Sequence, residues 1–159
     1  MFNDKKIIIR EIKNKDYSHL EEFLFYSIHQ IEHKLPKEII YSPEVYLYIE
    51  DYGKKDDNGV IAEVDGKILG MAWTRVISGY GHIDNQTPEL AISVSPKAQG
   101  FGIGTKLMNE LFRLLKTKGY KQTSLAVQKT NRAVNFYQKL GYQIILEKEE
   151  EFIMVKKLI

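Results

Sequence analysis

The chain has 159 residues, of which 23 are basic and 21 acidic, and it contains no cysteine. This composition excludes a disulfide framework, a cysteine-based zinc site and a cysteine nucleophile. No apolar run reaches the ~18 residues of a membrane helix, and the first residues lack the apolar core of a signal peptide. We therefore expect one cytoplasmic domain spanning residues 1–159, with no membrane partner.

The first third of the chain predicts a strand followed by helices. Residues 7–12 are rich in isoleucine and predict a strand. Apolar residues recur at helical spacing over 20–31, with Asp16 as the expected N-terminal cap. A second, short helix is expected after Ser42-Pro43, inside a polar, tyrosine-rich segment that runs from 37 to 58.

The middle of the chain predicts three strands. Residues 60–64 and 68–77 are β-rich and flank Asp65-Gly66. An Asp-Gly pair between two such runs is typical of a tight hairpin, because both turn positions need a positive φ. A glycine-rich connection over 78–88 then leads to a strand at 89–94.

The last third alternates helices and strands. An apolar stripe at helical period predicts a helix over 103–117, and a strand follows at 123–127. Asn131 is the expected cap of a further helix that ends at Lys139. Two final strands, 142–147 and 151–157, are expected to form a hairpin. The order of elements predicts an α+β fold with a mixed sheet.

Charge is unevenly distributed along the chain. Residues 1–91 hold 11 basic and 16 acidic side chains, whereas residues 92–159 hold 12 and 5. The excess of basic residues over 92–159 favours a phosphate-bearing ligand, either nucleic acid or a phosphorylated cofactor. Ordinary solvent-exposed helix faces would produce the same excess. Of the 23 basic residues 19 are lysine, and no nucleic-acid-binding signature is present, so we do not expect a nucleic-acid partner.

A glycine-rich segment, Gln99-Gly100-Phe101-Gly102-Ile103-Gly104-Thr105, joins the strand at 89–94 to the helix at 103–117. A turn of this kind offers backbone N–H groups and the positive end of the helix dipole to a phosphate. The spacing fits neither the P-loop nor the dinucleotide fingerprint. If either pattern begins at Gly100, it requires a glycine at position 105, where this chain has Thr105.

Within this segment, Gln99-x-x-Gly102-x-Gly104 resembles the Arg/Gln-x-x-Gly-x-Gly/Ala signature of the GNAT acetyltransferase superfamily. The downstream run Asn131–Tyr142, with its Phe136-Tyr137 pair, resembles the second signature of that family. The resemblance covers residues 59–158. It implies a mixed, mostly antiparallel central sheet of about seven strands flanked by about four helices. It also implies an enzyme that moves an acetyl group from acetyl-CoA to an amine by direct attack in a ternary complex.

The resemblance further implies a site for coenzyme A between the fourth and fifth strands, with the pyrophosphate on the glycine-rich segment. Basic side chains such as Lys97, Lys129 and Arg132 are then expected near the remaining phosphates, and no metal is expected. The implied cofactor-binding residues are Ile92, Val94, Gln99, Gly100, Gly102, Gly104, Thr105 and Asn131, the last of which also fits a plain helix cap.

Acyl transfer to an amine requires a neutral amine, hydrogen-bond donors for the oxyanion and a proton for the departing thiolate. The resemblance makes Tyr137 the general acid, and a reference pKa of ~10 keeps it protonated at neutral pH. Glu89 is the expected base, acting directly or through water, and His82 is the alternative. The backbone N–H of Val94 is the expected oxyanion donor. A half-buried core tyrosine and a surface acid are the structural alternatives for Tyr137 and Glu89.

The acceptor pocket is expected to take residues from the first helices and from the connection before the fourth strand, namely Tyr26, His29, Glu32, Trp73, Tyr80 and His82. The acidic first half favours a cationic amine, either a small molecule or a peptide. The final hairpin is compatible with a homodimer. Three rival functions are a non-catalytic acyl-CoA-binding protein, a less favoured basic nucleic-acid-binding module and a zinc peptidase. The last follows from the spacing of His29, Glu32 and His33, and it lacks an evident third ligand.

Overall fold

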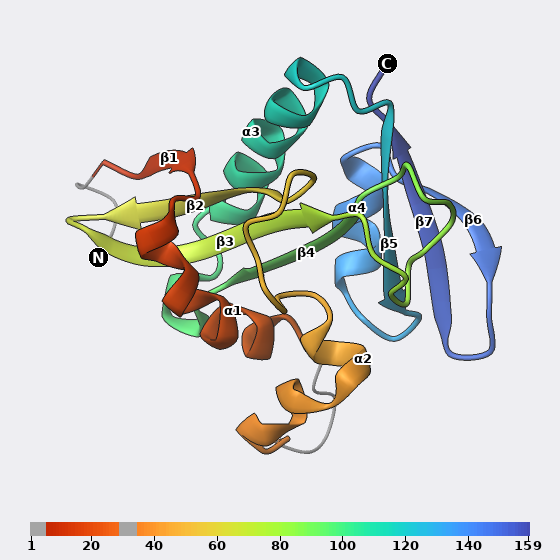
Figure 1. The fold of residues 1–159 in the computed structure, drawn as a ribbon, viewed down its shortest axis with the longest axis horizontal. Coiled ribbons are helices and arrows are strands. Elements are labelled where there is room, and N and C mark those ends of the chain that lie inside the picture. The colour runs from red at the N-terminus through yellow and green to blue at the C-terminus, as the bar shows by residue number, and fades with distance from the viewer. Residues whose placement is uncertain (1–5, 29–34) are drawn as a thin grey trace.

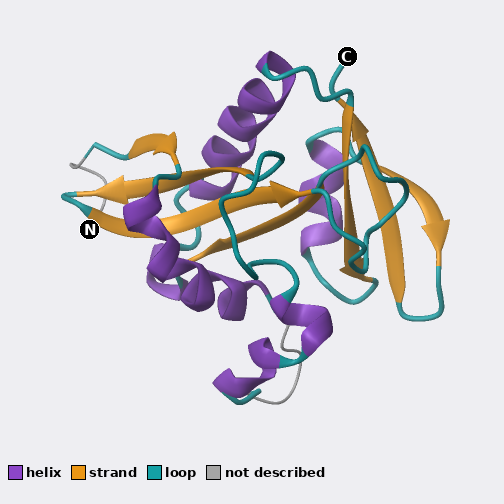
Figure 2. Ribbon diagram, viewed as in Figure 1, coloured by secondary structure: helices purple, strands orange, loops and turns teal. Residues whose placement is uncertain are grey.

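The computed structural model describes residues 6–28 and 35–159, which form one seven-stranded sheet with helices against it (Figure 1, Figure 2). The strands are β1 (Ile8–Glu11), β2 (Asn58–Val64), β3 (Lys67–Arg75), β4 (Glu89–Val94), β5 (Gln122–Gln128), β6 (Gln143–Glu147) and β7 (Glu151–Lys157). The α-helices of the described residues are α1 (Leu20–Ser27), α2 (Pro43–Tyr46), α3 (Ile103–Thr117) and α4 (Ala133–Lys139). The expected α+β fold is confirmed.

The strands lie in the order β1-β2-β3-β4-β5-β7-β6. Each neighbouring pair is antiparallel except β4 and β5, which are parallel. The turn between β2 and β3 has the conformation that its sequence predicts, with φ of 53° at Asp65 and 78° at Gly66. The two halves of the sheet, β1–β4 and β5–β7, therefore meet at the single parallel junction.

Helices cover both faces of the sheet (Figure 1). Because side chains alternate along a strand, Val60 and Ala62 of β2 pack in a core cluster with α3, whereas Ile61 packs in a second cluster with α1. The apolar stripe predicted for α3 is buried, at Ile103, Leu107, Leu111 and Leu115. No helix of the described residues is both long and apolar enough to cross a bilayer.

The parallel junction between β4 and β5 is brief. The only Cα partners along it are Glu89 and Ser124, at the beginning of β4. Beyond that point the two strands separate, so the rest of β4 has no strand on its β5 side within the described residues. This divergence opens the sheet between β4 and β5, where the family resemblance implies the site for coenzyme A, and it creates the cleft described below.

The first helix begins differently from the prediction. Asp16 does not cap an α-helix but lies in a short 3-10 helix, Asn14–His19, that precedes α1. Its carboxylate accepts two hydrogen bonds from Arg10, at 2.8 and 2.9 Å, and one from the N–H of Lys13 at 2.8 Å. The buried ion pair with β1 therefore fixes this turn. At its other end α1 stops at Ser27, since Ile28 has an extended backbone, and residues 29–31 of the expected helix lie outside the described residues.

We expect Asp16→Asn to destabilise the protein by about 2 kcal/mol at pH 7, because it weakens charge-assisted hydrogen bonds of a buried group. The hydrogen bonds from Arg10 lower the pKa of Asp16 below its ordinary value. A lowered folded-state pKa stabilises the fold above pH ~4, and this stabilisation is lost as the pH falls through the folded-state value. Urea unfolding at pH 7, 4 and 2.5 measures both effects.

Glu110→Gln is the matched control, since Glu110 forms an exposed ion pair with Arg113 on α3. Exposed pairs contribute less than ~1 kcal/mol, so this variant should unfold almost as the wild type does. Equal losses in the two variants would contradict the structural role of Asp16.

Candidate active site

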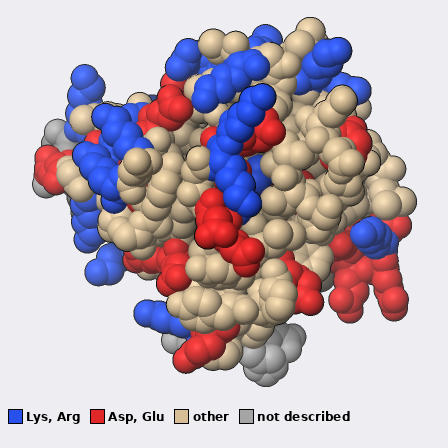
Figure 3. Space-filling model, in the orientation of Figure 1, with Lys and Arg blue, Asp and Glu red and all other residues tan. Residues whose placement is uncertain are grey.

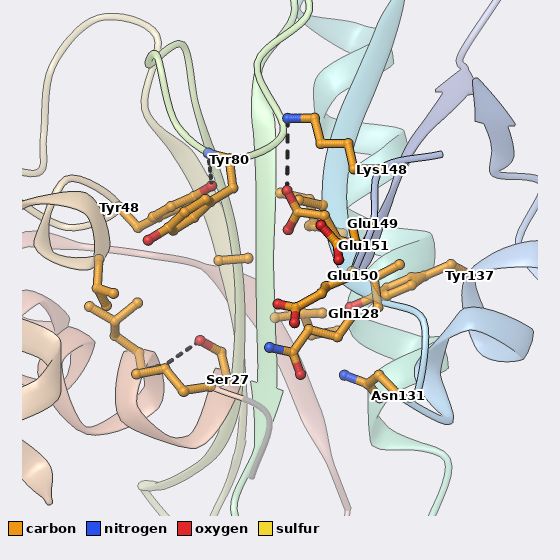
Figure 4. Close-up of a pocket in the computed structure, with 18 residues that line it drawn as sticks. Ser27, Tyr48, Tyr80, Gln128, Asn131, Tyr137, Lys148, Glu149, Glu150 and Glu151 are labelled. Atoms are coloured by element: carbon orange, nitrogen blue, oxygen red, sulfur yellow. Dashed lines mark hydrogen bonds and ion pairs between the residues drawn. The ribbon is translucent and has the colours of Figure 1, made fainter. Parts of the chain in front are cut away.

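A cleft of about 630 Å³ opens where β4 and β5 separate. Figure 4 shows Tyr48 and Tyr80 on one side of it and Gln128, Asn131 and Tyr137 on the other. Its walls come from α1, β4, β5, α4, the segment after α2 and the β6–β7 turn. The lining residues are Leu24, Ser27, Ile28, Val45, Tyr48, Tyr80, Leu90, Ala91, Ile92, Ala126, Val127, Gln128, Asn131, Tyr137, Lys148, Glu149, Glu150 and Glu151.

The main chain of β4 presents hydrogen-bonding groups to this cleft. The carbonyl of Pro88 accepts a hydrogen bond from β5 at 3.0 Å, and the N–H of Ser95 donates to β3 at 2.7 Å. Successive residues of a strand direct their N–H and C=O groups to opposite sides. Ile92 and Val94 share the parity of Pro88, so their main-chain groups face the open side of β4, where an extended ligand would find the partners of a missing strand. Ile92 lines the cleft, whereas Val94 does not, and the carbonyl of Val94 accepts the side-chain amide of Gln99 at 3.4 Å.

The glycine-rich segment lies at the end of β4 and leads into α3. Gly100 and Gly102 have φ of 86° and 77°, in the left-handed region, and a Cβ built on either would meet no atom within 4 Å. The first hydrogen bond of α3 runs from Lys106 to Gly102, so the preceding N–H groups of the helix lack intrahelical acceptors. Open space over backbone donors at a helix N-terminus fits a pyrophosphate.

Tyr137 and Asn131 line the cleft from the α4 side. The Tyr137 ring lies 5.5 Å from the ring of Phe136 and 5.7 Å from that of Tyr142, centroid to centroid. Burial raises the pKa of Tyr137 to about 12, so its hydroxyl keeps its proton throughout the physiological range. Asn131 also accepts the N–H of Ala133 at 2.8 Å while it lines the cleft, but the N-cap of α4 is Arg132, one residue after the predicted cap.

Glu89 is buried, with 1% of its surface exposed, and lies behind the cleft wall. Its carboxylate accepts the N–H groups of Gly79 and Gly81, each at 2.8 Å, and the hydroxyl of Tyr48 at 2.9 Å. Burial raises the pKa of Glu89, while these three hydrogen bonds act in the opposite direction. The predicted base is therefore held beside the cleft, and Tyr48 stands between them.

Two residues of β3 hold the segment that carries Tyr48. The indole N–H of Trp73 donates to the carbonyl of Tyr48 at 2.9 Å, and Arg75 donates to the carbonyl of Leu47 at the same distance. Arg75 is itself anchored by Asp57 at 2.9 Å. Trp73 has 0% exposure and therefore lies in the core beneath the site. It is not part of the cleft wall, so the prediction that it contacts the acceptor is wrong.

The connection between β3 and β4 contributes Tyr80 to the cleft. Tyr80 is 48% exposed, and its N–H donates to the hydroxyl of Tyr48 at 3.0 Å. His82, two residues on, lies outside the set of lining residues, and its Nδ1 is 3.0 Å from the carbonyl oxygen of Ile77. Of the two predicted bases, Glu89 is thus the one linked by a hydrogen bond to a residue of the wall.

The remaining predicted acceptor residues lie elsewhere. Tyr26 lines a second pocket, of about 580 Å³, between α1 and the β2–β3 turn, and its hydroxyl donates to Glu22 at 3.0 Å. His29, Glu32 and His33 lie outside the described residues. Over the described residues, no group of three His, Cys, Asp or Glu side chains is arranged as metal ligands.

The basic residues predicted near phosphates have varied surroundings. Lys129 pairs with Glu147 at 2.7 Å and lies 5.5 Å from the Phe152 ring centroid. Lys97 lines the second pocket, on the same side of the fold as the glycine-rich segment. Arg132 is exposed at the start of α4, next to Asn131.

Sequence reasoning missed two parts of the wall. One is Tyr48, which the composition marked only as a member of a tyrosine-rich segment. The other is the acidic turn between β6 and β7, where Lys148 is 3.8 Å from Glu151, while Glu149 and Glu150 add further carboxylates. Figure 3 shows acidic side chains gathered at this end of the molecule.

The model of the acetyltransferase (GNAT) family matches residues 24–142, three quarters of the chain. The chain belongs to this family. Of its two signatures, the second lines the cleft with Asn131 and Tyr137, whereas the glycine-rich segment lies beyond the end of β4 and outside the set of lining residues.

Among curated GNAT relatives, the mycothiol acetyltransferase of Arthrobacter sp. is 34% identical over 90 residues, which make up 55% of this chain and 28% of that protein. The N-alpha-acetyltransferase of Sulfurisphaera tokodaii is 28% identical over 107 residues, 62% of this chain and 64% of that protein. The chain thus spans less than a third of the length of the mycothiol acetyltransferases that it matches.

Among solved structures, the PaiA N-acetyltransferase of Thermoplasma acidophilum, in complex with coenzyme A, superposes with a TM-score of 0.71. The two sequences are 24% identical, and the match covers 96% of this chain and 99% of that one. At this level of identity the likeness shows the fold, which is the GNAT fold over almost the whole length.

Proposed function

We propose that the protein is an acetyl-CoA-dependent N-acetyltransferase that acts on an amine by direct attack in a ternary complex. The observation that carries the proposal is the β4–β5 cleft, which is lined by Ile92, Asn131 and Tyr137, with the glycine-rich segment beyond the end of β4. A GNAT fold with these elements supports transfer more than binding alone, because the hydroxyl of Tyr137 keeps its proton and would be available to protonate a thiolate in the cleft.

In this proposal the extended arm of coenzyme A lies along β4, against the main chain of Ile92 and Val94. The pyrophosphate lies on the segment Gln99–Thr105, and the amide of Asn131 binds the arm from the other side. Acetyl-CoA supplies an activated acetyl thioester. The backbone N–H of Val94 then stabilises the oxyanion, and Tyr137 donates a proton to the departing sulfur. With no cysteine in the chain, no acyl-cysteine intermediate forms.

The acceptor enters from the side formed by Tyr80 and the β6–β7 turn. Glu149 and Glu150 give this entrance negative charge, which favours a cationic amine over a neutral or acidic one. An aromatic ring at the same entrance is also compatible with a cation. Both a small polyamine and a peptide amine have this chemistry.

The direct test is release of free thiol from acetyl-CoA in the presence of an amine panel that contains polyamines, lysine peptides, α-amines of peptides, and neutral controls. We expect turnover with cationic amines, a KM that rises with salt, and initial rates that exclude a ping-pong mechanism. Binding of acetyl-CoA without turnover of any amine would favour the non-catalytic alternative, and ping-pong kinetics would contradict the ternary complex.

Acetyl-CoA should raise the melting temperature by several degrees, and Gly102→Leu should abolish this shift. The added side chain would fill the open space over the glycine-rich segment, where the proposal places the pyrophosphate. Because the shift arises by mass action on the folded state, differential scanning fluorimetry with and without saturating acetyl-CoA measures it.

Gly66→Leu is the matched control for this variant. Gly66, in the β2–β3 turn, has φ of 78° against 77° for Gly102, and a Cβ at either position meets open space. Both substitutions should therefore incur about 1–2 kcal/mol of backbone strain. A retained shift in Gly66→Leu and a lost one in Gly102→Leu separates ligand binding from strain, and equal shifts would contradict the phosphate site.

A further inference from the structure

We propose that Tyr48 is the group that takes the proton from the acceptor amine and that it passes its own proton to the buried Glu89. Tyr48 would then be the catalytic residue that touches the substrate, and Glu89 would act through it. The inference rests on the proposed function, because it assigns a proton path within the same cleft.

The geometry of three groups carries the inference. Tyr48 lines the cleft, whereas Glu89 has 1% exposure, and the Tyr48 hydroxyl donates to Oε1 of Glu89 at 2.9 Å. The same hydroxyl accepts the N–H of Tyr80 at 3.0 Å, which fixes its rotation so that its proton points to Glu89. A phenolic oxygen has a second lone pair. The N–H of Gly81, whose nearest acceptor is Oε1 of Glu89 at 2.8 Å, also approaches this oxygen, and a donor in the cleft would take the place of that weaker contact.

Direct removal of a proton from the substrate by the Glu89 carboxylate is less compatible with this arrangement. Its Oε1 accepts both Tyr48 and the N–H of Gly81, and its Oε2 accepts the N–H of Gly79. These contacts enclose the carboxylate from the side of the β3–β4 connection and from the side of the segment after α2. A proton from the acceptor therefore reaches Glu89 by exchange at Tyr48.

The proton transfer balances without any further reactant. An acceptor ammonium gives one proton to the oxygen of Tyr48 while the original hydroxyl proton of Tyr48 moves to Oε1 of Glu89. The products are a neutral amine, a neutral tyrosine and a neutral glutamic acid. The amine then forms the C–N bond as the C–S bond breaks; Tyr137 gives its proton to the departing sulfur, and the second proton of the attacking nitrogen replaces it on Tyr137. The proton on Glu89 returns through Tyr48 to water after the product leaves.

The surroundings of Glu89 suit a carboxylate that is protonated for part of the cycle. Burial raises its pKa. The charged or titratable groups that face it are Tyr48 from the segment after α2 and His82 from the β3–β4 connection. Arg75, its register partner on β3, directs its guanidinium to Asp57 and to the carbonyl of Leu47. The carboxylate thus holds a proton more readily than an exposed one does.

The test compares Tyr48→Phe with Tyr41→Phe, whose exposed hydroxyl bonds Glu21 away from the cleft. At pH 7 we expect Tyr48→Phe to lower kcat/KM about 100-fold for an alkylamine of pKa ~10.4. For a peptide α-amine of pKa ~7.7 the loss should be at least tenfold smaller, because more of that amine is already neutral. Raising the pH should restore the variant toward the wild type, and Tyr41→Phe should match the wild type throughout.

Losses that are equal for both amines and independent of pH would overturn the relay and leave Tyr48 a structural role. A second measurement needs no acceptor amine. The Glu89 carboxyl is titrated by infrared spectroscopy, and its band is assigned as the one that is absent from Glu89→Gln. Removing the Tyr48 hydroxyl takes a donor from the carboxylate, so Tyr48→Phe should raise the pKa of Glu89 further. If the pKa of Glu89 is the same in Tyr48→Phe as in the wild type, the relay is overturned, even if no amine is acetylated. If that pKa shifts but the wild type acetylates no amine, only the proposed function is contradicted.

Discussion

Replacing Tyr137 by phenylalanine is expected to lower kcat about 100-fold while the affinity for acetyl-CoA changes less than about twofold, since general acids typically contribute a factor of this order. The substitution removes only the hydroxyl, and the ring keeps its contacts with Phe136 and Tyr142. Steady-state turnover and equilibrium binding of acetyl-CoA measure the two quantities separately.

The pH dependence adds a second expectation for the same residue. A general acid must be protonated to act, and the pKa of Tyr137 is raised to about 12 by burial. Deprotonation of Tyr137 should therefore cause no fall in kcat below about pH 11. A fall in kcat near pH 8 to 9 that is present in the wild type and absent from Tyr137→Phe would contradict this assignment of the pKa.

Tyr142→Phe is the control for Tyr137→Phe. Tyr142 is 2% exposed, its ring is 5.7 Å from that of Tyr137, and it is not part of the cleft wall. We expect its turnover to remain within about threefold of the wild type, because no proton is transferred there. Unchanged turnover in Tyr137→Phe, or equal losses in the two variants, would remove Tyr137 from the mechanism.

Local sequence patterns predicted most of the fold. The hairpin at Asp65-Gly66 and the stripe on α3 depend on residues close in sequence, so their signals were complete in short windows. The start of α1 was predicted wrongly, because Asp16 is a good helix cap in isolation but here pairs with Arg10 on β1. That pairing depends on how the chain folds back, which no short window contains.

The site divides in the same way. The glycine-rich segment and Tyr137 belong to contiguous signatures; Tyr137 lines the cleft, and the glycine-rich segment follows the end of β4. Tyr48 and Glu89 are 41 positions apart, and only the packing of the segment after α2 on β3 places them together. The acidic entrance was also misjudged from charge counts, since Glu149 and Glu150 belong to the basic half of the chain.

Gly79→Ala is expected to lower kcat by about 10- to 100-fold although it alters neither Tyr48 nor Glu89. A Cβ at Gly79 would stand 2.6 Å from the hydroxyl of Tyr48 and 2.7 Å from Oε1 of Glu89, and both distances are too short for ordinary contact. One of the two side chains must therefore move, and the hydrogen bond between them lengthens or breaks. Because the obstructing atoms are ends of side chains, the fold should lose less than about 1 kcal/mol.

Gly81→Ala provides the contrast, because the obstruction there is backbone. A Cβ at Gly81 would meet the main chain of Leu125 and Ala126 on β5 at 2.8 to 2.9 Å, and a strand paired with β7 cannot move aside easily. We expect this variant to lose about 2 kcal/mol of stability. Chemical denaturation and turnover, measured on both variants, should show activity lost without stability at Gly79. The opposite pattern, an active but unstable Gly79→Ala, would mean that the close approach of Gly79 to Tyr48 and Glu89 serves packing and not proton transfer.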